Sequence, residues 1–280
     1  MDHRSPACEL AKNKRAPVKL RFVHITDHHL RADNQLVRGY STTSALLAVL
    51  RHIANNAGTI DFVVSTGDLV QSGTDAEYQT FLGMLGAQAA AAMPGPLIIN
   101  AHGFHDVPIY VVPGNHDKRT AFFRNLFTTV PEDQLMNTSF EYGNLRFVFL
   151  DWGPEGKAVA SPALLNHLGT TLRDEMPTVL LMHHHVIPVG SRWLDLAIAD
   201  GIDRFVEQIT GKNVIGIFSG HTHATYEKTI CGFPVYGLRS TCFQFVLQDE
   251  LLCCLLAPHY RVVSIENGVL TTEIIEVPLS

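Results

Sequence analysis

Five short apolar runs in this chain each end directly before a polar motif, and this repeated pattern constrains the fold more than any other feature. Each run has the length and composition of a buried β-strand. The runs are Leu20–Ile25, Phe62–Thr66, Ile109–Val112, Thr178–Met182 and Val214–Ser219. The motifs that follow are Asp27-His28-His29, Gly67-Asp68, Gly114-Asn115-His116-Asp117, His183-His184-His185 and Gly220-His221-Thr222-His223. Because an α/β fold builds its site at strand ends, we expect these side chains to meet at one edge.

The rest of the chain predicts helices between these strands and a strand-rich C-terminal part. One helix follows candidate caps at Ser41 to Ser44. The other predicted helices are about Asp75 through Ala87–Ala92, Arg119–Phe127, Ser161–Arg173 and Asp195–Thr210. The predicted late strands are Thr225–Ile230, Pro234–Leu238, Cys242–Leu247, Tyr260–Ile265 and Val269–Val277. We predict an α/β fold, a two-sheet β-sandwich flanked by helices, with all motif loops at one edge.

Length and composition indicate a single domain. A flexible leader over residues 1–17 precedes a domain over 18–280, in which strands from about residue 225 complete the second sheet. A net charge of −6 without a Lys/Arg cluster argues against a nucleic-acid partner. The five cysteines are odd in number and lack framework spacing, which favours reduced thiols in the cytoplasm.

No membrane partner is predicted. The first 17 residues have no apolar core typical of a signal peptide. The apolar stretch Leu251–Ala257 is too short to cross a bilayer, and we expect it to form a buried strand or a homodimer contact. The stretch from Leu85 to Pro108 has no assigned role.

Oxygen and imidazole donors without cysteine are typical of a site for Mn, Fe or Zn. If one carboxylate is shared, seven such ligands are enough for two divalent metal ions per chain. Gly67, Gly114 and Gly220 allow the sharp turns that aim these side chains. Taken singly, Asp27 or Asp68 could equally be a polar residue that caps a strand end. Taken together in this order, the motifs indicate a binuclear metallohydrolase.

The order Asp-x-His, Gly-Asp, Gly-Asn-His-Asp, strand-end His and Gly-His-x-His resembles the signature of the calcineurin-like metallophosphoesterases. The resemblance covers about Phe22 to His223 and implies their α/β/β/α fold. It assigns Asp27, His29 and His223 to the first ion and makes Asp68 the bridge. The second ion takes the strand-end histidine, for which His183 is favoured over His184. Its other implied ligands are Asn115 and His221.

Two further segments are similar to bacterial class III cyclic-nucleotide phosphodiesterases. They are Met182–Gly190 with Trp193-Leu194-Asp195, and Ser240–Phe245. The resemblance implies hydrolysis of a small phosphodiester, cyclic AMP to AMP, through a metal-bridging hydroxide. Val186 stands where that family has a proline. The alternatives are a broad diesterase, such as a glycerophosphodiesterase or nucleotide pyrophosphatase, and a non-catalytic metal-binding scaffold.

Five residues are candidates for catalysis or substrate binding beyond ligation. His116 cannot easily ligate beside Asn115, so it is free to contact phosphate or protonate the leaving oxygen, and Asn115 lies within reach of the same phosphate. Asp117 could orient the His116 ring. Trp193 or Phe243 could offer an aromatic face to a base, although a buried core role is as common for Trp193. Asp151 has no signal beyond its place near a strand end.

Overall fold

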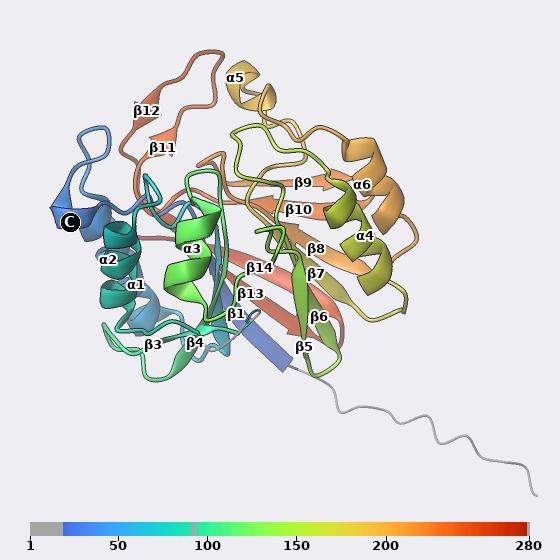
Figure 1. Ribbon diagram of the computed structural model, residues 1–280, viewed down its shortest axis with the longest axis horizontal. Coiled ribbons are helices and arrows are strands. Elements are labelled where there is room, and N and C mark those ends of the chain that lie inside the picture. Colours follow the sequence, from blue (N-terminus) through green and yellow to red (C-terminus); the bar gives the residue numbers. More distant parts are fainter. Residues whose placement is uncertain (1–18, 91–92, 94, 279–280) are drawn as a thin grey trace, which may run out of the picture.

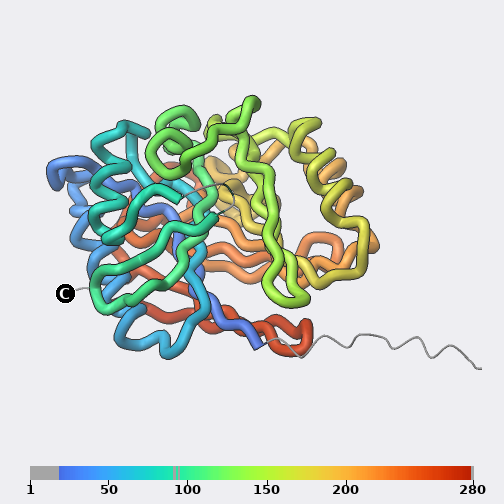
Figure 2. The backbone as a smooth tube through the Cα atoms, turned by 60° about the horizontal axis from the view of Figure 1, so that its bottom comes forward, coloured from blue at the N-terminus to red at the C-terminus, as the bar shows by residue number. Residues whose placement is uncertain are grey.

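The computed structural model describes residues 19–90, 93 and 95–278, and it has two six-stranded mixed sheets packed face to face. The first sheet has the order β14-β13-β1-β2-β4-β3. Its strands are β1 (Lys19–Ile25), β2 (Phe62–Thr66), β3 (Leu97–Ile99), β4 (Val107–Val112), β13 (His259–Glu266) and β14 (Val269–Glu276). Figure 2 shows β1 running beside the two C-terminal strands, with which it pairs antiparallel through β13.

The second sheet has the order β5-β6-β7-β8-β10-β9. Its strands are β5 (Thr138–Tyr142), β6 (Leu145–Leu150), β7 (Thr178–Met182), β8 (Val214–Phe218), β9 (Tyr226–Ile230) and β10 (Phe233–Gly237). A separate two-stranded hairpin consists of β11 (Gln244–Phe245) and β12 (Cys253–Cys254). In Figure 1 this hairpin projects beyond the sheets, next to α5.

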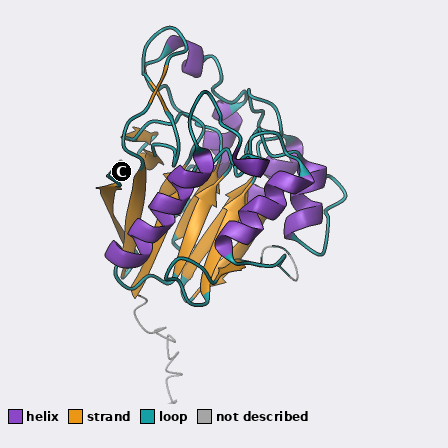
Figure 3. Ribbon diagram, turned by 90° about the vertical axis from the view of Figure 1, so that its left-hand side faces the viewer, coloured by secondary structure: helices purple, strands orange, loops and turns teal. Residues whose placement is uncertain are grey.

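Helices cover the outer face of each sheet, so the layers run helix, sheet, sheet, helix (Figures 1 and 3). The first sheet is covered by α1 (Thr42–Asn56), α2 (Asp75–Leu85) and α3 (Arg119–Leu126). The second is covered by α4 (Pro162–Thr171) and α6 (Ile202–Ile209), while the short α5 (Arg192–Asp195) lies beyond the sheet beside the hairpin. A short 3-10 helix, η1 (Ala32–Asn34), lies between β1 and α1. The predicted fold is confirmed.

Alternation along the strands separates the inner core from the outer ones. In β1, Leu20 and Phe22 face the second sheet, whereas Val23 and Ile25 pack against the helices. Phe62 stacks on Phe22 between the sheets with ring centroids 5.3 Å apart. This buried layer fixes the two sheets relative to each other, which matters because both of them contribute to one site.

Two helices are shorter than predicted. The helix from Asp75 ends at Leu85, not within the alanine cluster, because Gly86 takes φ +60° and its N–H caps the carbonyls of Leu82 and Gly83. Of the predicted helix Asp195–Thr210, only α6 forms beyond Asp195, the last residue of α5; Gly201, at φ +84°, is the N-cap from which α6 begins. Two of the alanines, Ala91 and Ala92, lie outside the described residues.

The C-terminal part differs most from its prediction. Only β9 and β10 extend the second sheet, whereas β13 and β14 join the first sheet beside β1. The predicted strand Cys242–Leu247 is reduced to the two residues of β11. The stretch Leu251–Ala257 is not a buried strand: its four leucines are each 44–49% exposed. The predicted leader, residues 1–17, lies outside the described residues.

Candidate metal centre

The predicted ligands converge at the edge where the strands end, and both sheets contribute. Asp27, His29, Asp68 and Asn115 follow strands β1, β2 and β4 of the first sheet. His183, His221 and His223 follow strands β7 and β8 of the second. In Figure 3 this edge appears as the crowded loops at the ends of the strands.

One cluster forms around Asp27. Its Oδ1 lies 3.4 Å from Nε2 of His223 and 4.0 Å from Nε2 of His29. The two imidazole nitrogens face each other at 3.1 Å. Asp27, His29 and His223 could therefore hold one cation between them.

A second cluster forms around Asn115. Its Oδ1 lies 3.1 Å from Nε2 of His183 and 3.0 Å from Nδ1 of His221, and those two nitrogens are 3.2 Å apart. Oδ2 of Asp68 lies between the clusters, 3.4 Å from Nε2 of His183 and 3.5 Å from Nε2 of His29. One carboxylate oxygen is thus shared by two donor sets.

Backbone groups form hydrogen bonds with those side-chain atoms of the ligand candidates that point away from the two clusters. Nδ1 of His183 donates to the Thr66 carbonyl and Nδ1 of His223 donates to the Phe243 carbonyl, both at 2.8 Å. Because a carbonyl only accepts, each of these rings keeps its Nε2 lone pair for the cluster. Oδ1 of Asp68 accepts from the His116 N–H at 2.8 Å, which leaves Oδ2 free. Such fixed outer contacts are typical of metal ligands.

Five ligand candidates have a left-handed backbone. The φ angles are 55° at Asp27, 47° at His29, 48° at Asp68, 67° at His221 and 47° at His223. Such conformations cost on the order of 1–3 kcal/mol each in a non-glycine residue and persist only where the surroundings impose them. The turn bends each side chain sharply away from the strand direction, and for Asp68 and His221 the sequence predicted this from the preceding glycine.

All three of the motif glycines are required by close approach, since a Cβ at Gly67 would stand 2.5 Å from Nδ1 of His183. A Cβ at Gly114 would stand 2.1 Å from Oδ1 of Asp68, and one at Gly220 would stand 2.1 Å from Oγ1 of Thr26. Gly67 has in addition φ +94°, a region that favours glycine. The loops of the two sheets pack so closely here that even a methyl group would displace a ligand.

Of the three consecutive histidines, His183 alone aims a ring nitrogen at Asp68 and Asn115. Nε2 of His184 is instead held by the Glu155 carbonyl at 2.8 Å. The His185 ring stacks on His221 at 5.5 Å, outside the cluster. This arrangement favours His183 over His184 as the ligand.

Burial lowers the pKa of His29 and His221 and so favours their neutral form, which binds metal. It lowers the pKa of His29 to about 3. Burial also lowers the pKa of His183, but the carboxylates of Asp68 and Asp27 outweigh it and raise the pKa to about 9. The nearby His183 holds the pKa of Asp68 well below its usual range despite burial. The cluster thus combines two buried carboxylates with a strong preference for positive charge.

His116 lies beside the ligands, and its ring is oriented by Gln71. Its Nδ1 donates to the Gln71 backbone carbonyl at 2.7 Å, so Nε2 is the basic nitrogen of the neutral ring. The expectation that Asp117 orients this ring does not match the structure. The Asp117 carboxylate instead accepts hydrogen bonds from the N–H groups of Leu69 and Gly114 and from the Tyr78 hydroxyl. It therefore joins the loops that follow β2 and β4.

The two aromatic candidates occupy different places. Phe243 is 2% exposed and packs on the rings of His29 and His223 at 5.6 and 5.0 Å, so it cannot offer a free face to a base. Trp193 is half-buried, with its ring edge-on to Phe245 at 4.9 Å. Phe245 itself stacks on His223 at 4.3 Å. Sequence reasoning missed Phe245, although it belongs to the same Ser240–Phe245 segment.

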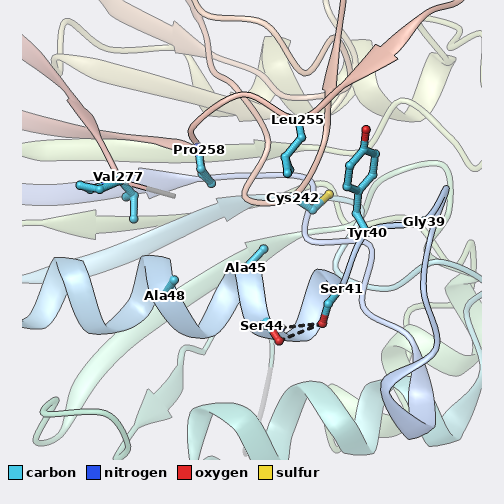
Figure 4. Close-up of a pocket in the computed structure, with 11 residues that line it drawn as sticks. Gly39, Tyr40, Ser41, Ser44, Ala45, Ala48, Cys242, Leu255, Pro258 and Val277 are labelled. Atoms are coloured by element: carbon cyan, nitrogen blue, oxygen red, sulfur yellow. Dashed lines mark hydrogen bonds between the residues drawn. The ribbon is translucent and has the colours of Figure 1, made fainter. Parts of the chain in front are cut away.

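A cavity of about 320 Å³ lies nearby but is not lined by any of the seven ligand candidates. Figure 4 shows Tyr40 and Cys242 at one end of it and α1 along its floor. Tyr40 stacks on Phe243, which in turn packs on the metal-site histidines. The cavity and the ligand clusters therefore lie around different faces of the same aromatic cluster.

Comparison with known proteins identifies similar chains. Residues 20–225 match the family of calcineurin-like phosphoesterases. The chain is 25% identical to a 3′,5′-cyclic-nucleotide phosphodiesterase of Nostoc sp., over 96% of either chain. It is 28% identical to the 3′,5′-cyclic adenosine monophosphate phosphodiesterase CpdA of Escherichia coli K12, over 91% of this chain and 89% of the relative.

Among solved structures, a dimetal phosphatase from Danio rerio superposes with a TM-score of 0.60 at 15% identity. It covers 92% of this chain and 99% of its own. At that identity the likeness concerns the fold alone.

Proposed function

Because this chain belongs to the calcineurin-like phosphoesterase family, we propose that it is a metal-dependent phosphodiesterase acting on 3′,5′-cyclic nucleotides, with cyclic AMP hydrolysed to AMP. Both relatives described above have cyclic-nucleotide phosphodiesterase names and match nearly the whole chain. Their names support the substrate class, and the donor sets of the site support the metal dependence.

The position of Asp68 supports two ions per chain more than any other observation. Its Oδ2 lies within 3.5 Å of a nitrogen from each donor set. We assign Asp27, His29 and His223 to one ion and Asn115, His183 and His221 to the other, with Asp68 shared. The donors are oxygen and imidazole, which suit Mn, Fe or Zn. Two such ions, when bound, neutralise phosphate charge and lower the pKa of a water so that it can attack phosphorus.

His116 is the proposed acid. Its Nδ1–H is fixed by the Gln71 carbonyl, so Nε2 takes up or releases the proton. The ring lies 4.7 Å from the His29 ring, next to the ligands without being needed among them. An imidazolium here would stabilise the phosphate and deliver its Nε2 proton to the leaving oxygen. Asn115 would bring its amide N–H group towards the same phosphate.

The partner is a small molecule, and no nucleic-acid surface or membrane is involved. Within the described part of the chain, no helix has both the length and the apolarity that a bilayer crossing requires. The described cysteines Cys231, Cys242, Cys253 and Cys254 are free thiols, which favours a cytoplasmic location. A homodimer through the exposed leucines of the hairpin remains a prediction.

Steady-state kinetics on a substrate panel tests the proposal. Cyclic AMP should be hydrolysed faster than AMP, because the second ester group removes a charge that this acidic chain would otherwise have to offset. The panel adds 3′,5′-cyclic GMP, 2′,3′-cyclic nucleotides, glycerophosphodiesters and ADP-ribose. Equal or faster turnover of AMP would make the chain a phosphatase, and a preference for glycerophosphodiesters or ADP-ribose would support the alternative diesterase function.

A further inference from the structure

A buried ion pair joins the two sheets directly behind Asn115. Arg119 is the first residue of α3, which follows the Asn115 turn of the first sheet, and Asp151 directly follows β6 of the second. The two residues are 7% and 1% exposed. Nε and Nη2 of Arg119 donate to the two carboxylate oxygens of Asp151 at 2.8 and 2.6 Å. This is the two-bond geometry that fixes direction as well as distance.

The remaining donors of the guanidinium hold the turn itself. Nη1 donates to the carbonyls of Gly114 and Asp117, both at 2.6 Å. Those two carbonyls flank Asn115 and His116 on either side. Nη2 also donates to the Gly153 carbonyl, next to Asp151, at 2.9 Å. A single planar group therefore ties both ends of the Asn115 turn to the end of β6.

We propose that Arg119 and Asp151 are positioning residues that set the Asn115 side of the metal site. Asn115 arrives from the first sheet, but its partner His183 follows β7, the strand next to β6. A link from the turn to β6 thus sets the 3.1 Å contact between Asn115 and His183. The inference rests on the proposed two-ion site and names residues outside its ligand set.

Lysine cannot reproduce this arrangement. Its ammonium is a point charge on a flexible stem, whereas the contacts here use three nitrogens of a planar fork. Arg119→Lys keeps the charge against Asp151 and removes the simultaneous hold on the two turn carbonyls. It is therefore the informative substitution.

The chain offers a matched control on the same strand. Arg146 lies near the start of β6, is also 7% exposed, and binds Asp174 through two hydrogen bonds of 2.8 Å each. It also donates to a backbone carbonyl, that of Thr171, at 2.8 Å. Arg146→Lys makes the same chemical change at the opposite end of β6.

Calorimetric titration of the metal-depleted full-length chain with Mn²⁺ tests the inference. In Arg119→Lys, the dissociation constant of one ion should rise about 10–100-fold, as for outer contacts of metal ligands, while the other changes less than about threefold. Excess Mn²⁺ should restore kcat for cyclic AMP. Arg146→Lys should leave both dissociation constants unchanged.

Three results would overturn the inference. They are unchanged Mn²⁺ binding in Arg119→Lys, equal weakening of both ions together with a lower unfolding temperature, and an equal effect of Arg146→Lys. If Arg119→Lys does not fold, Asp151→Asn must weaken the same single ion. A wild-type chain that binds fewer than two ions would refute the two-ion function instead. In that case, faster hydrogen exchange at the His116 amide in Arg119→Lys, and not in Arg146→Lys, still decides the positioning role.

Discussion

The ligand edge and the hairpin beside it differ in how firmly the rest of the chain holds them in place. At the edge, ligands such as Asp27 and His223 are buried and their outer atoms are bound by the backbone. On the hairpin, strands β11 and β12 pair over only two residues each, and Leu251 and Leu252 are about half exposed. The ligand edge is thus fixed by the fold, whereas the hairpin is a segment that the fold constrains little.

The largest effect is expected from the shared carboxylate. Asp68→Ala removes the only oxygen proposed to contact both ions, so metal binding and catalysis should fail together. We expect kcat/KM for bis(p-nitrophenyl) phosphate with Mn²⁺ to fall by about 10³-fold or more, equal to about 4 kcal/mol. Asp174→Ala is the control, since Asp174 is an exposed aspartate that binds Arg146 at the far end of β6. Full activity without Asp68 would refute its assignment as the carboxylate shared by two ions.

The second largest effect separates chemistry from ligation at the same edge. His116→Ala should lower kcat by about 10²–10⁴-fold, the range for a lost general acid. Its Mn²⁺ content, measured by mass spectrometry of the metal, should stay near two ions per chain. Loss of an ion from this variant would place His116 among the ligands.

A third substitution probes where the edge meets the hairpin. Phe243 is buried against His29 and His223, so Phe243→Ala should lower the free energy of unfolding by about 3–5 kcal/mol. It should also reduce kcat/KM for cyclic AMP and for bis(p-nitrophenyl) phosphate equally. Urea unfolding and kinetics with cyclic AMP and bis(p-nitrophenyl) phosphate measure this. A variant of normal stability that loses cyclic AMP alone would return Phe243 to the role of a base-stacking residue.

The smallest effect is expected at Trp193, the half-buried aromatic candidate. Stacking of a base on an aromatic ring contributes about 1–3 kcal/mol, so Trp193→Ala should raise KM for cyclic AMP about tenfold. Turnover of bis(p-nitrophenyl) phosphate should hardly change, since that substrate has no base. If kinetics with the two substrates change alike, Trp193 packs against Phe245 and does not contact the base of cyclic AMP.

The sequence predicted that the ligand candidates converge because each one follows its strand closely, and a strand end is a local pattern. The link between Arg119 and Asp151 could not be predicted, since it joins two sheets and Arg119 follows no strand directly. One signal existed: β6 is an apolar run followed by Asp151, the same pattern that identified Asp27 and Asp68. Gln71 could not be predicted, because its contact with His116 uses a backbone carbonyl that any residue would supply.

The division of the ligands between two sheets has a consequence for how the enzyme is made. The first sheet alone offers Asp27, His29, Asp68 and Asn115, and the second offers only histidines. Neither half has the complete set of either ion, so tight metal uptake must follow docking of the sheets during folding. The proposed ions, once bound, would tie the sheets together: at a free concentration 100 times the dissociation constant, one bound ion would add about 2.7 kcal/mol to the stability of the folded chain. Metal supply in the cell would then control not only activity but also how long the folded enzyme survives proteolysis.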